Sequence, residues 1–344
     1  MNQATSLQRV QTALDHEAPQ RVPQLFIFAS RAAREVGMTP REYFSDPERV
    51  IETQLRILEK YSNDCVSAFS YAAVDAAAWG GDVRWFDDGP PNAGAPVIRD
   101  PAQIDDLEAP TVAGNAALMP TLAVLEGLAE LVGDTVPIVG VVIAPLSLPV
   151  MQLGFEGWLD LLRDDPVRVD RLLALNSSFC TEWANAQLVA GATAICYFNP
   201  VASPTILPVA RYRELGLPVD QRTIAQIDGA TVTHMASGRS LGIVDELVAS
   251  GTKGIGFGFL EDVAGVRAAC QGRLMMLGNL NGVAMRHWTP AQAADEVHHL
   301  LDVVGPGGGF CLSDSHGEVP WQVPDEVLRA IALSLERHAG EGAR

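Results

Sequence analysis

Two histidines stand directly after apolar, strand-like runs, and they are the residues best suited to chemistry. His234 ends the run TVTH, and His316 follows the run GGFCLSDS. A histidine at such a place can transfer a proton, anchor a substrate or bind a metal ion, although backbone groups alone can also hold one. A zinc ion would need a further donor, and Cys311 and Asp314 are the nearest by type. The sequence therefore predicts His234 and His316 as catalytic residues and, together with Cys311, as candidate metal ligands.

Polar side chains also follow other apolar runs. Asn199 follows AICYF, Asn279 lies in GNLNG, and Tyr71 and Asp75 come just after the second run. The asparagines of GNLNG can also simply cap a tight turn, and Arg31, just past the first run, can also lie on an exposed helix face. We expect Asp75 to be catalytic. We expect five side chains to bind substrate: Asn199, Asn279, Tyr71, Asp314 and Arg31.

Short apolar runs alternate with longer segments of helical period along nearly the whole chain. Eight runs are expected as strands: Gln24–Ala29, Cys65–Phe69, Ile138–Ile143, Ala194–Phe198, Thr231–His234, Gly254–Phe257, Leu274–Leu277 and Gly309–Leu312. Because parallel neighbours need crossover connections, this alternation favours a parallel sheet. Eight strands would close a (β/α)8 TIM barrel, with the active site at their carboxyl ends. No GxGxxG motif follows the first run, which argues against an open dinucleotide-binding sheet.

Amphipathic segments and one insertion complete the predicted α/β architecture. The expected helices are Glu48–Lys60, Ala116–Leu131, Val167–Leu188, Leu241–Ala249, Val263–Ala269, Ala291–Val304 and Pro324–His338. The segment Asp82–Pro110 is rich in proline and predicts turns and extended chain, with a hairpin over the barrel rim. A bare barrel needs about 250 residues. The 344 residues therefore fit a single domain, 1–344, with an N-terminal helical segment and a rim insertion.

Composition narrows the class of protein. The formal net charge of −18 repels phosphate backbones, so nucleic acid is not expected as a partner. Five scattered cysteines without CxxC spacing indicate a reducing compartment. The N-terminus has no apolar signal-peptide core, and the longest apolar stretch, around Val136–Met151, is broken by prolines. We therefore expect a cytoplasmic protein without a membrane partner.

Several segments resemble the uroporphyrinogen decarboxylase superfamily, which includes the corrinoid-dependent methyltransferases. RVQTALDHEAPQRVP is similar to the family's opening, AWGGDVRWFDDGPP to the segment after its second strand, and QLVAGATAICYFNPVAS to a later strand. THMASG stands where the family has a strand-end histidine motif, and LGNLNG and GGFCLSDSHGEVPWQVPDEVL resemble its last two strands. The similarity runs from near Arg9 to about Leu333 and implies a TIM barrel.

The resemblance favours the methyltransferase branch. The decarboxylases carry an arginine-rich motif that binds the porphyrinogen's carboxylates, and FASRAAREVGM retains only Arg31 and Arg34. Thiol-methylating members of the other branch hold zinc with a His-x-Cys motif and a later Cys. Carried over to this chain, these positions are His234, Ala236 and His316 or a residue close to it. Because alanine cannot bind zinc, the resemblance implies either that another donor completes a zinc site or that zinc is absent.

The motifs lead to an expected function. The resemblance implies a methyltransferase that moves a methyl group between a small substrate (a methoxy, methylthio or thiol compound, or folate) and a corrinoid (cobalamin) on a separate carrier protein. Two alternatives stay open. A cofactor-independent decarboxylase of a small carboxylic acid would turn Arg31 into its pocket, and a non-catalytic binding barrel would leave the site without a metal. A homodimer also stays open.

Overall fold

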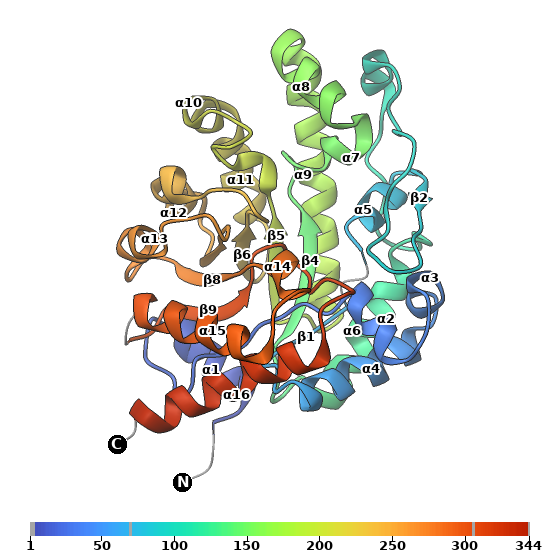
Figure 1. The fold of residues 1–344 in the computed structure, drawn as a ribbon. Helices are drawn as coiled ribbons and strands as arrows, with labels where there is room; N and C mark the ends of the chain where they lie inside the picture. Colours follow the sequence, from blue (N-terminus) through green and yellow to red (C-terminus); the bar gives the residue numbers. More distant parts are fainter. Residues whose placement is uncertain (1–3, 69–70, 305–306, 343–344) are drawn as a thin grey trace.

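The computed structural model describes residues 4–68, 71–304 and 307–342, and a curled parallel sheet lies at its centre (Figure 1). The sheet has seven strands, paired in the order β1-β4-β5-β6-β7-β8-β9. Their bounds are β1 Val66–Ser67, β4 Ile138–Ile143, β5 Ala194–Phe198, β6 Ala230–His234, β7 Gly254–Gly256, β8 Met275–Leu280 and β9 Phe310–Asp314. Neighbouring strands pair in the order in which they follow along the chain, and helices make the crossovers that parallel pairing requires. The α/β parallel architecture expected from the alternation is confirmed.

The first apolar run does not form a strand, so the prediction of a strand at Gln24–Ala29 is wrong. Gln24 makes only an isolated parallel bridge to Leu312 of β9. On its other side, the Gln24 carbonyl accepts the N–H of Asp64 at 2.7 Å. The segment therefore lies between β9 and the chain that leads into β1, where an eighth strand would stand.

The side chain of Asn63 explains why strand pairing stops there. The N–H of Phe26 donates to Oδ1 of Asn63 at 3.0 Å, and Nδ2 of Asn63 donates back to the Phe26 carbonyl at 3.0 Å. An amide side chain thus occupies both backbone groups that a neighbouring strand would pair with.

The second expected strand is also shorter than predicted. Strand β1 covers only Val66–Ser67 of the predicted range Cys65–Phe69, and Phe69 lies outside the described residues.

Helices surround the sheet (Figure 1). Their bounds are α1 Ser6–Leu14, α2 Ser30–Glu35, α3 Pro40–Phe44, α4 Pro47–Lys60, α5 Ala73–Ala78, α6 Met119–Val132, α7 Pro149–Leu153, α8 Phe155–Asp164, α9 Pro166–Val189, α10 Val209–Arg211, α11 Leu217–Ile224, α12 Val244–Ser250, α13 Val263–Cys270, α14 Gly282–Met285, α15 Pro290–Val304 and α16 Asp325–Gly342, with short 3₁₀ turns at Pro101–Asp106, Pro200–Ala202 and Leu241–Ile243 and a π turn at Tyr212–Gly216. The seven expected helices are all present, with shifted ends. None of the helices described has both the length and the apolar character needed to span a bilayer.

Local chemistry sets where the long helices begin. Asp46 accepts the N–H of Arg49 ahead of α4, and Asp165 accepts the N–H of Arg168 ahead of α9. In both helices proline takes the first position, where no intrahelical hydrogen bond is lost. Asp–Pro in this sequence therefore marks a helix start.

The predicted hairpin is confirmed in the proline-rich insertion. Strands β2, Val83–Arg84, and β3, Asn92–Ala93, pair antiparallel. The loop between them, residues 85–91, ends with Pro90 and Pro91. The tip of this hairpin returns to the carboxyl ends of the central strands, where it lines a cavity described below.

The inner face of the sheet carries two small apolar clusters. One joins α1 to the strands through Val10, Ala13, Leu25, Cys65, Met275 and Cys311. The other contains Ile27, Val141 and Cys196. These side chains leave a cavity of about 130 Å³ inside the sheet, whereas a barrel of this class usually has a packed interior.

Candidate active site

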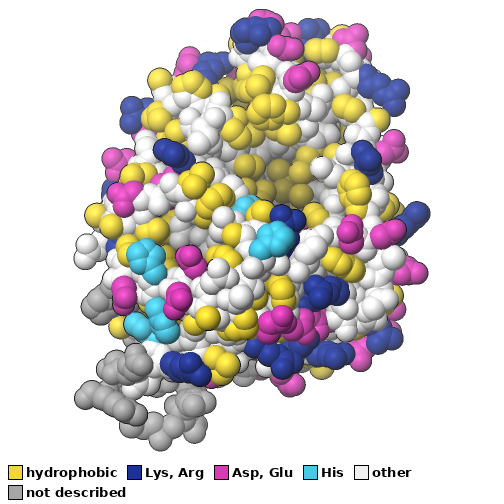
Figure 2. Space-filling model, in the orientation of Figure 1, with side chains coloured by type: hydrophobic (Ala, Val, Ile, Leu, Met, Phe, Trp, Pro, Cys, Tyr) yellow, Lys and Arg dark blue, Asp and Glu magenta, His cyan; other side chains and the backbone are white. Residues whose placement is uncertain are grey.

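A cavity of about 230 Å³ opens at the carboxyl ends of the strands, next to the β2–β3 hairpin, and we call it the rim cavity. It is lined by Ile27, Tyr71, Ala72, Pro90, Pro91, Asn92, Val141, Cys196, Phe198, His316, Gly317 and Glu318. This is the end of the sheet at which barrel enzymes carry their active sites. The face drawn in Figure 2 is hollowed, with hydrophobic side chains in the hollow and histidine at its margin.

A second cavity, of about 130 Å³, lies inside the sheet, and we call it the inner cavity. It is lined by Leu7, Val10, Gln11, Leu14, Leu25, Ile27, Cys65, Pro137, Val139, Thr193, Ala194, Ile195, Cys196, Ala230, Val232, His234, Met275, Leu277, Ser313 and Gly317. Helix α1 covers one end. Ile27, Cys196 and Gly317 belong to both cavities, so the two share a wall.

Gly317 contributes its backbone to the wall that the two cavities share. Its φ of +105° lies in the region that favours glycine. A Cβ added there would come within 2.7 Å of the Phe198 ring and 3.8 Å of Cε1 of His234. The glycine of LSDSHGEVP therefore lets the chain pass closely over the ends of β5 and β6.

His234 is buried and faces the inner cavity. Its Nδ1 accepts the backbone N–H of Ala236 at 3.0 Å, so a neutral ring carries its proton on Nε2. The ring stacks on Phe198, with 5.3 Å between centroids. Burial, with a smaller effect of the His316 charge, lowers its pKa to about 4. His234 is therefore a neutral ring at physiological pH.

His316 lines the rim cavity instead. Its ring stacks on Phe259 at 5.7 Å, and its backbone N–H donates to Oδ2 of Asp314 at 2.8 Å. Burial and then the charge of Arg286 lower the pKa of His316, and burial raises that of Asp314 to about 6. The structure thus places the two predicted histidines in neighbouring cavities and not in one.

Glu318 is the rim-cavity residue that sequence reasoning missed. Its Oε1 accepts the hydroxyl of Ser30 at 2.8 Å, and its Oε2 accepts the N–H of Ser30 at 3.2 Å. Burial raises the pKa of this carboxyl to about 7. The available signal was its place in SHGEVP, two residues after His316, because chain that crosses a cavity mouth can present more than one side chain to it.

Asn199 is buried in a network behind the strand ends. Its Oδ1 accepts the hydroxyl of Ser147 at 2.8 Å, and its Nδ2 donates to Oδ2 of Asp220 at 2.9 Å. Asp220 also accepts the hydroxyls of Tyr197 and Tyr212 at 2.8 and 2.7 Å. Burial raises the pKa of Asp220 to about 6. Because its amide is already engaged, Asn199 positions the loop after β5.

Asp75 lies between α5, β4 and α9 and lines neither of the two cavities in the described part of the chain. Its carboxylate accepts the N–H of Ile143 at 2.8 Å and Nε1–H of Trp183 at 3.2 Å. Burial raises its pKa to about 7. The structure therefore gives this predicted catalytic residue a packing position between helices and sheet.

Replacing Asp75 with alanine should cost about 1–3 kcal/mol of unfolding free energy, because two buried donors lose their acceptor. Urea unfolding of the variant measures this cost. Asp87→Ala, an exposed carboxylate on the hairpin, is the matched control and should leave stability within about 0.5 kcal/mol. If the Asp75 variant were as stable as the parent but had lost turnover, Asp75 would be a catalytic residue as the sequence predicted.

The structure does not bring Arg31 to the rim cavity. The guanidinium is 1% exposed and bonds Glu35 at 2.7 Å, Asp325 at 2.5 Å and the carbonyl of Val323 at 3.2 Å. Lys60 bonds the same two carboxylates. Arg31 therefore ties α2 to α4 and α16, and all its donors face protein.

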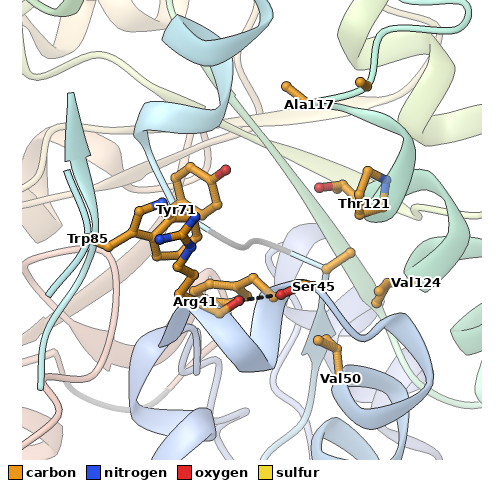
Figure 3. A pocket seen from close by; sticks show the side chains of 12 residues that line it. Arg41, Ser45, Val50, Tyr71, Trp85, Ala117, Thr121 and Val124 are labelled. Carbon is orange, nitrogen blue, oxygen red and sulfur yellow. Dashed lines mark hydrogen bonds between the residues drawn. The ribbon is translucent and has the colours of Figure 1, made fainter. Parts of the chain in front are cut away.

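Asn279 and Tyr71 have different surroundings. Nδ2 of Asn279 donates to the carbonyl of Gly258 at 3.0 Å, and Asn279 lines a groove between β8 and α15. Tyr71 lines the rim cavity and also a side pocket of about 380 Å³, where it meets Trp85 edge-on at 5.0 Å beside Arg41 (Figure 3). Of these two predicted substrate residues, Tyr71 is the one that the structure places in the rim cavity.

The side chains present do not fit a zinc site. Cys311 is fully buried in the α1 cluster, with its Sγ 3.5 Å from Sδ of Met275, and Nδ1 of His234 already accepts a hydrogen bond. Among the residues described, no group of three His, Cys, Asp or Glu side chains is placed to hold a metal ion.

Comparison with known proteins decides the family. A family model described as "Uroporphyrinogen decarboxylase (URO-D)" matches residues 5–338. The chain belongs to the uroporphyrinogen decarboxylase family. This confirms the resemblance that the sequence motifs indicated, and it places the chain in a family of enzymes.

Curated members of the URO-D family are distant relatives of the chain. The uroporphyrinogen decarboxylase of Azoarcus sp. (strain BH72) is 24% identical over 82% of this chain and 80% of its own length. That of Alkalilimnicola ehrlichii is 27% identical over 83% and 79%. Among solved structures, a methyltransferase from Methanosarcina mazei matches with a TM-score of 0.83 at 19% identity, covering 97% of this chain and 99% of that one. At such identity the structural match establishes the URO-D-like fold alone.

Proposed function

We propose that this chain is a methyltransferase that moves a methyl group between a small molecule in the rim cavity and a corrinoid on a separate carrier protein. The observation that carries the proposal is the rim cavity itself. Its volume of about 230 Å³ suits a small molecule, and its lining has no lysine or arginine among the described residues. A porphyrinogen bearing many carboxylates would need cationic partners that this lining does not supply.

Structural likeness supports the same proposal. The Methanosarcina mazei protein is titled a methyltransferase and matches nearly the whole chain. A B12-independent methionine synthase from Shewanella sp. W3-18-1 matches with a TM-score of 0.59 at 14% identity over 96% of this chain. The first likeness supports methyl transfer, while the second, to a B12-independent enzyme, does not bear on the corrinoid. The curated relatives, at 22–27% identity, carry the decarboxylase name.

The chain's own residues would bind and orient the substrate. His316 offers a neutral ring at the cavity, and its backbone is fixed by Asp314. Glu318 offers a carboxyl held in place by Ser30. The His234 ring stacks on the ring of Phe198 and holds it in position in the cavity wall. When bound, the corrinoid would supply the cobalt chemistry that accepts or donates the methyl group.

Methyl transfer can be measured with free cobalamin in place of the carrier protein. The purified chain is mixed with reduced cobalamin and with methoxy, methylthio or methylammonium compounds, and formation of methylcobalamin is followed by absorbance. His316→Ala should lower kcat/KM about tenfold, the loss expected for one hydrogen bond in the site. His299→Ala, on the exposed side of α15, should change nothing. If none of these compounds methylates cobalamin, the proposal is wrong.

The names of the sequence relatives favour a second candidate, decarboxylation of a small acid. That reaction needs a cation for the substrate carboxylate, and the structure engages Arg31 elsewhere. Release of CO2 from uroporphyrinogen or from small carboxylic acids, without added cofactor, is the measurement that would establish it. A chain that binds small molecules but supports neither reaction would be a non-catalytic barrel.

A further inference from the structure

Glu318 presents a carboxylate to the rim cavity with only part of its hydrogen-bonding capacity used. Ser30 supplies one donor to each of the two oxygens, from its hydroxyl and its backbone N–H. Among the described residues no other group bonds Glu318, and its side chain is half-buried. A carboxylate can accept about four hydrogen bonds, so the unused lone pairs are left for a molecule in the cavity.

Cations lie near the rim cavity but do not line it: Arg41 is beside Tyr71 in the side pocket, and the charge of Arg286 reaches His316. The lining has neither lysine nor arginine among the described residues. Arg286, whose charge reaches His316, lies outside the lining and donates to the carbonyl of Val283. Asp314, the last residue of β9, is a second buried carboxyl, and the whole chain carries a net charge of −18. An ionised Glu318 in a lining whose described residues include no lysine or arginine therefore favours a positive occupant over an anion.

Aromatic rings form another part of the lining. Tyr71 is held edge-on by Trp85, and Phe198 is held by the stacked ring of His234. Both rings line the rim cavity together with Ile27, Val141 and the prolines of the hairpin. Aromatic faces attract ammonium groups, and the apolar neighbours accommodate methyl groups. One face of Phe198 is covered by the His234 ring, so its other face is the one that could meet a ligand.

We propose that Glu318, Tyr71 and Phe198 form a binding site for a small organic ammonium ion that carries methyl groups. This rests on the proposed function, because it makes a methylated amine the substrate of that methyl transfer. The N–CH3 bond would break with its electron pair left on nitrogen, so a quaternary ammonium leaves as a neutral amine. The methyl group would pass to the electron pair of the reduced cobalt of the corrinoid.

Binding can be tested without corrinoid by comparing choline with 3,3-dimethyl-1-butanol, which has the same shape but no charge. Calorimetry is done at about pH 8.5, where Glu318, with its pKa of about 7, is ionised. Wild type should bind choline at least about tenfold tighter than the neutral compound, because only choline can form an ion pair with Glu318 and cation–π contacts with the rings. Equal affinity for the two compounds would overturn the inference.

Variants then test which side chains recognise the ammonium group. Glu318→Gln keeps an acceptor for Ser30 and should weaken choline binding about tenfold while leaving the neutral compound unchanged. Tyr71→Leu should weaken choline binding several-fold. Glu326→Gln, an exposed carboxylate on α16, is the matched control. Unchanged choline affinity in Glu318→Gln would contradict the proposal.

The failure of this inference and that of the proposed function can be told apart. Choline binding without methylcobalamin formation from any methylated amine, methoxy or methylthio compound would leave the ammonium site in place and remove the methyltransferase assignment. Methyl transfer from a methoxy or methylthio compound, together with equal affinity for choline and 3,3-dimethyl-1-butanol, would support the methyltransferase assignment and remove the ammonium site.

Discussion

Replacing Arg31 with alanine should destabilise the chain by about 3–5 kcal/mol, the usual cost of removing one partner from a buried ion pair. Glu35 is 3% exposed in this network, so the change leaves its carboxylate buried with Lys60 as its remaining cation. The hydroxyl of Tyr61, which Arg31 also contacts, loses a donor. Urea unfolding at neutral pH measures the effect.

The matched change Arg56→Ala removes an exposed arginine from α4 and should leave stability within about 0.5 kcal/mol. Arg31→Lys should recover only part of the loss, because an ammonium cannot reproduce the planar set of donors that reaches Glu35, Asp325 and Val323 together. The interpretation would be wrong if Arg31→Ala kept full stability and instead raised KM. That outcome would return Arg31 to the substrate site.

Arg31 shows how far sequence reasoning reaches in this chain. Its place after an apolar run suggested a side chain at the barrel rim. The run is not a strand, and the partner Asp325 stands 294 positions further along the chain. Local pattern shows that a cation is present, but it does not show which distant carboxylate will pair with it.

The strands and helices were predictable because their signals are local. Apolar runs such as Ile138–Ile143 and Ala194–Phe198 became strands with the expected bounds, since a strand buried on both faces needs an unbroken apolar run. The segment Gln24–Ala29 has the same character and failed because Asn63, nearly forty positions away, bonds the Phe26 backbone. A strand also needs a partner with free backbone groups, and composition does not reveal that partner.

The site was predictable to the level of the strand ends but not to the level of the cavity. His316 and Tyr71 reach the rim cavity as expected, whereas His234 faces the inner cavity. The difference arises at Gly317, where the chain turns over the sheet and separates two rings at the ends of β6 and β9. Glu318 enters the cavity through the same turn. Side-chain direction at a turn depends on φ and ψ, which the residue types alone leave open.

Asp220→Ala should also cost about 3–5 kcal/mol of unfolding free energy, since three buried donors lose a shared acceptor. These donors are the hydroxyls of Tyr197 and Tyr212 and the amide of Asn199. Asp220→Asn keeps the shape and one acceptor, and a tyrosine hydroxyl can rotate to accept from the new amide, so it should recover most of the loss. Exposed Asp228→Ala is the control.

The pH dependence of Asp220→Asn separates charge from shape. Burial raises the pKa of Asp220 to about 6 in the folded chain, from 3.8 in the unfolded chain. The folded state therefore holds its proton more tightly, and this group stabilises the fold fully below about pH 4 and loses that contribution as pH rises to about 6. The amide that replaces the carboxyl does not titrate, so the stability deficit of the variant should be largest near pH 4 and smaller at pH 8. A deficit that grows with pH would mean that Asp220 is held as a carboxylate by its three donors.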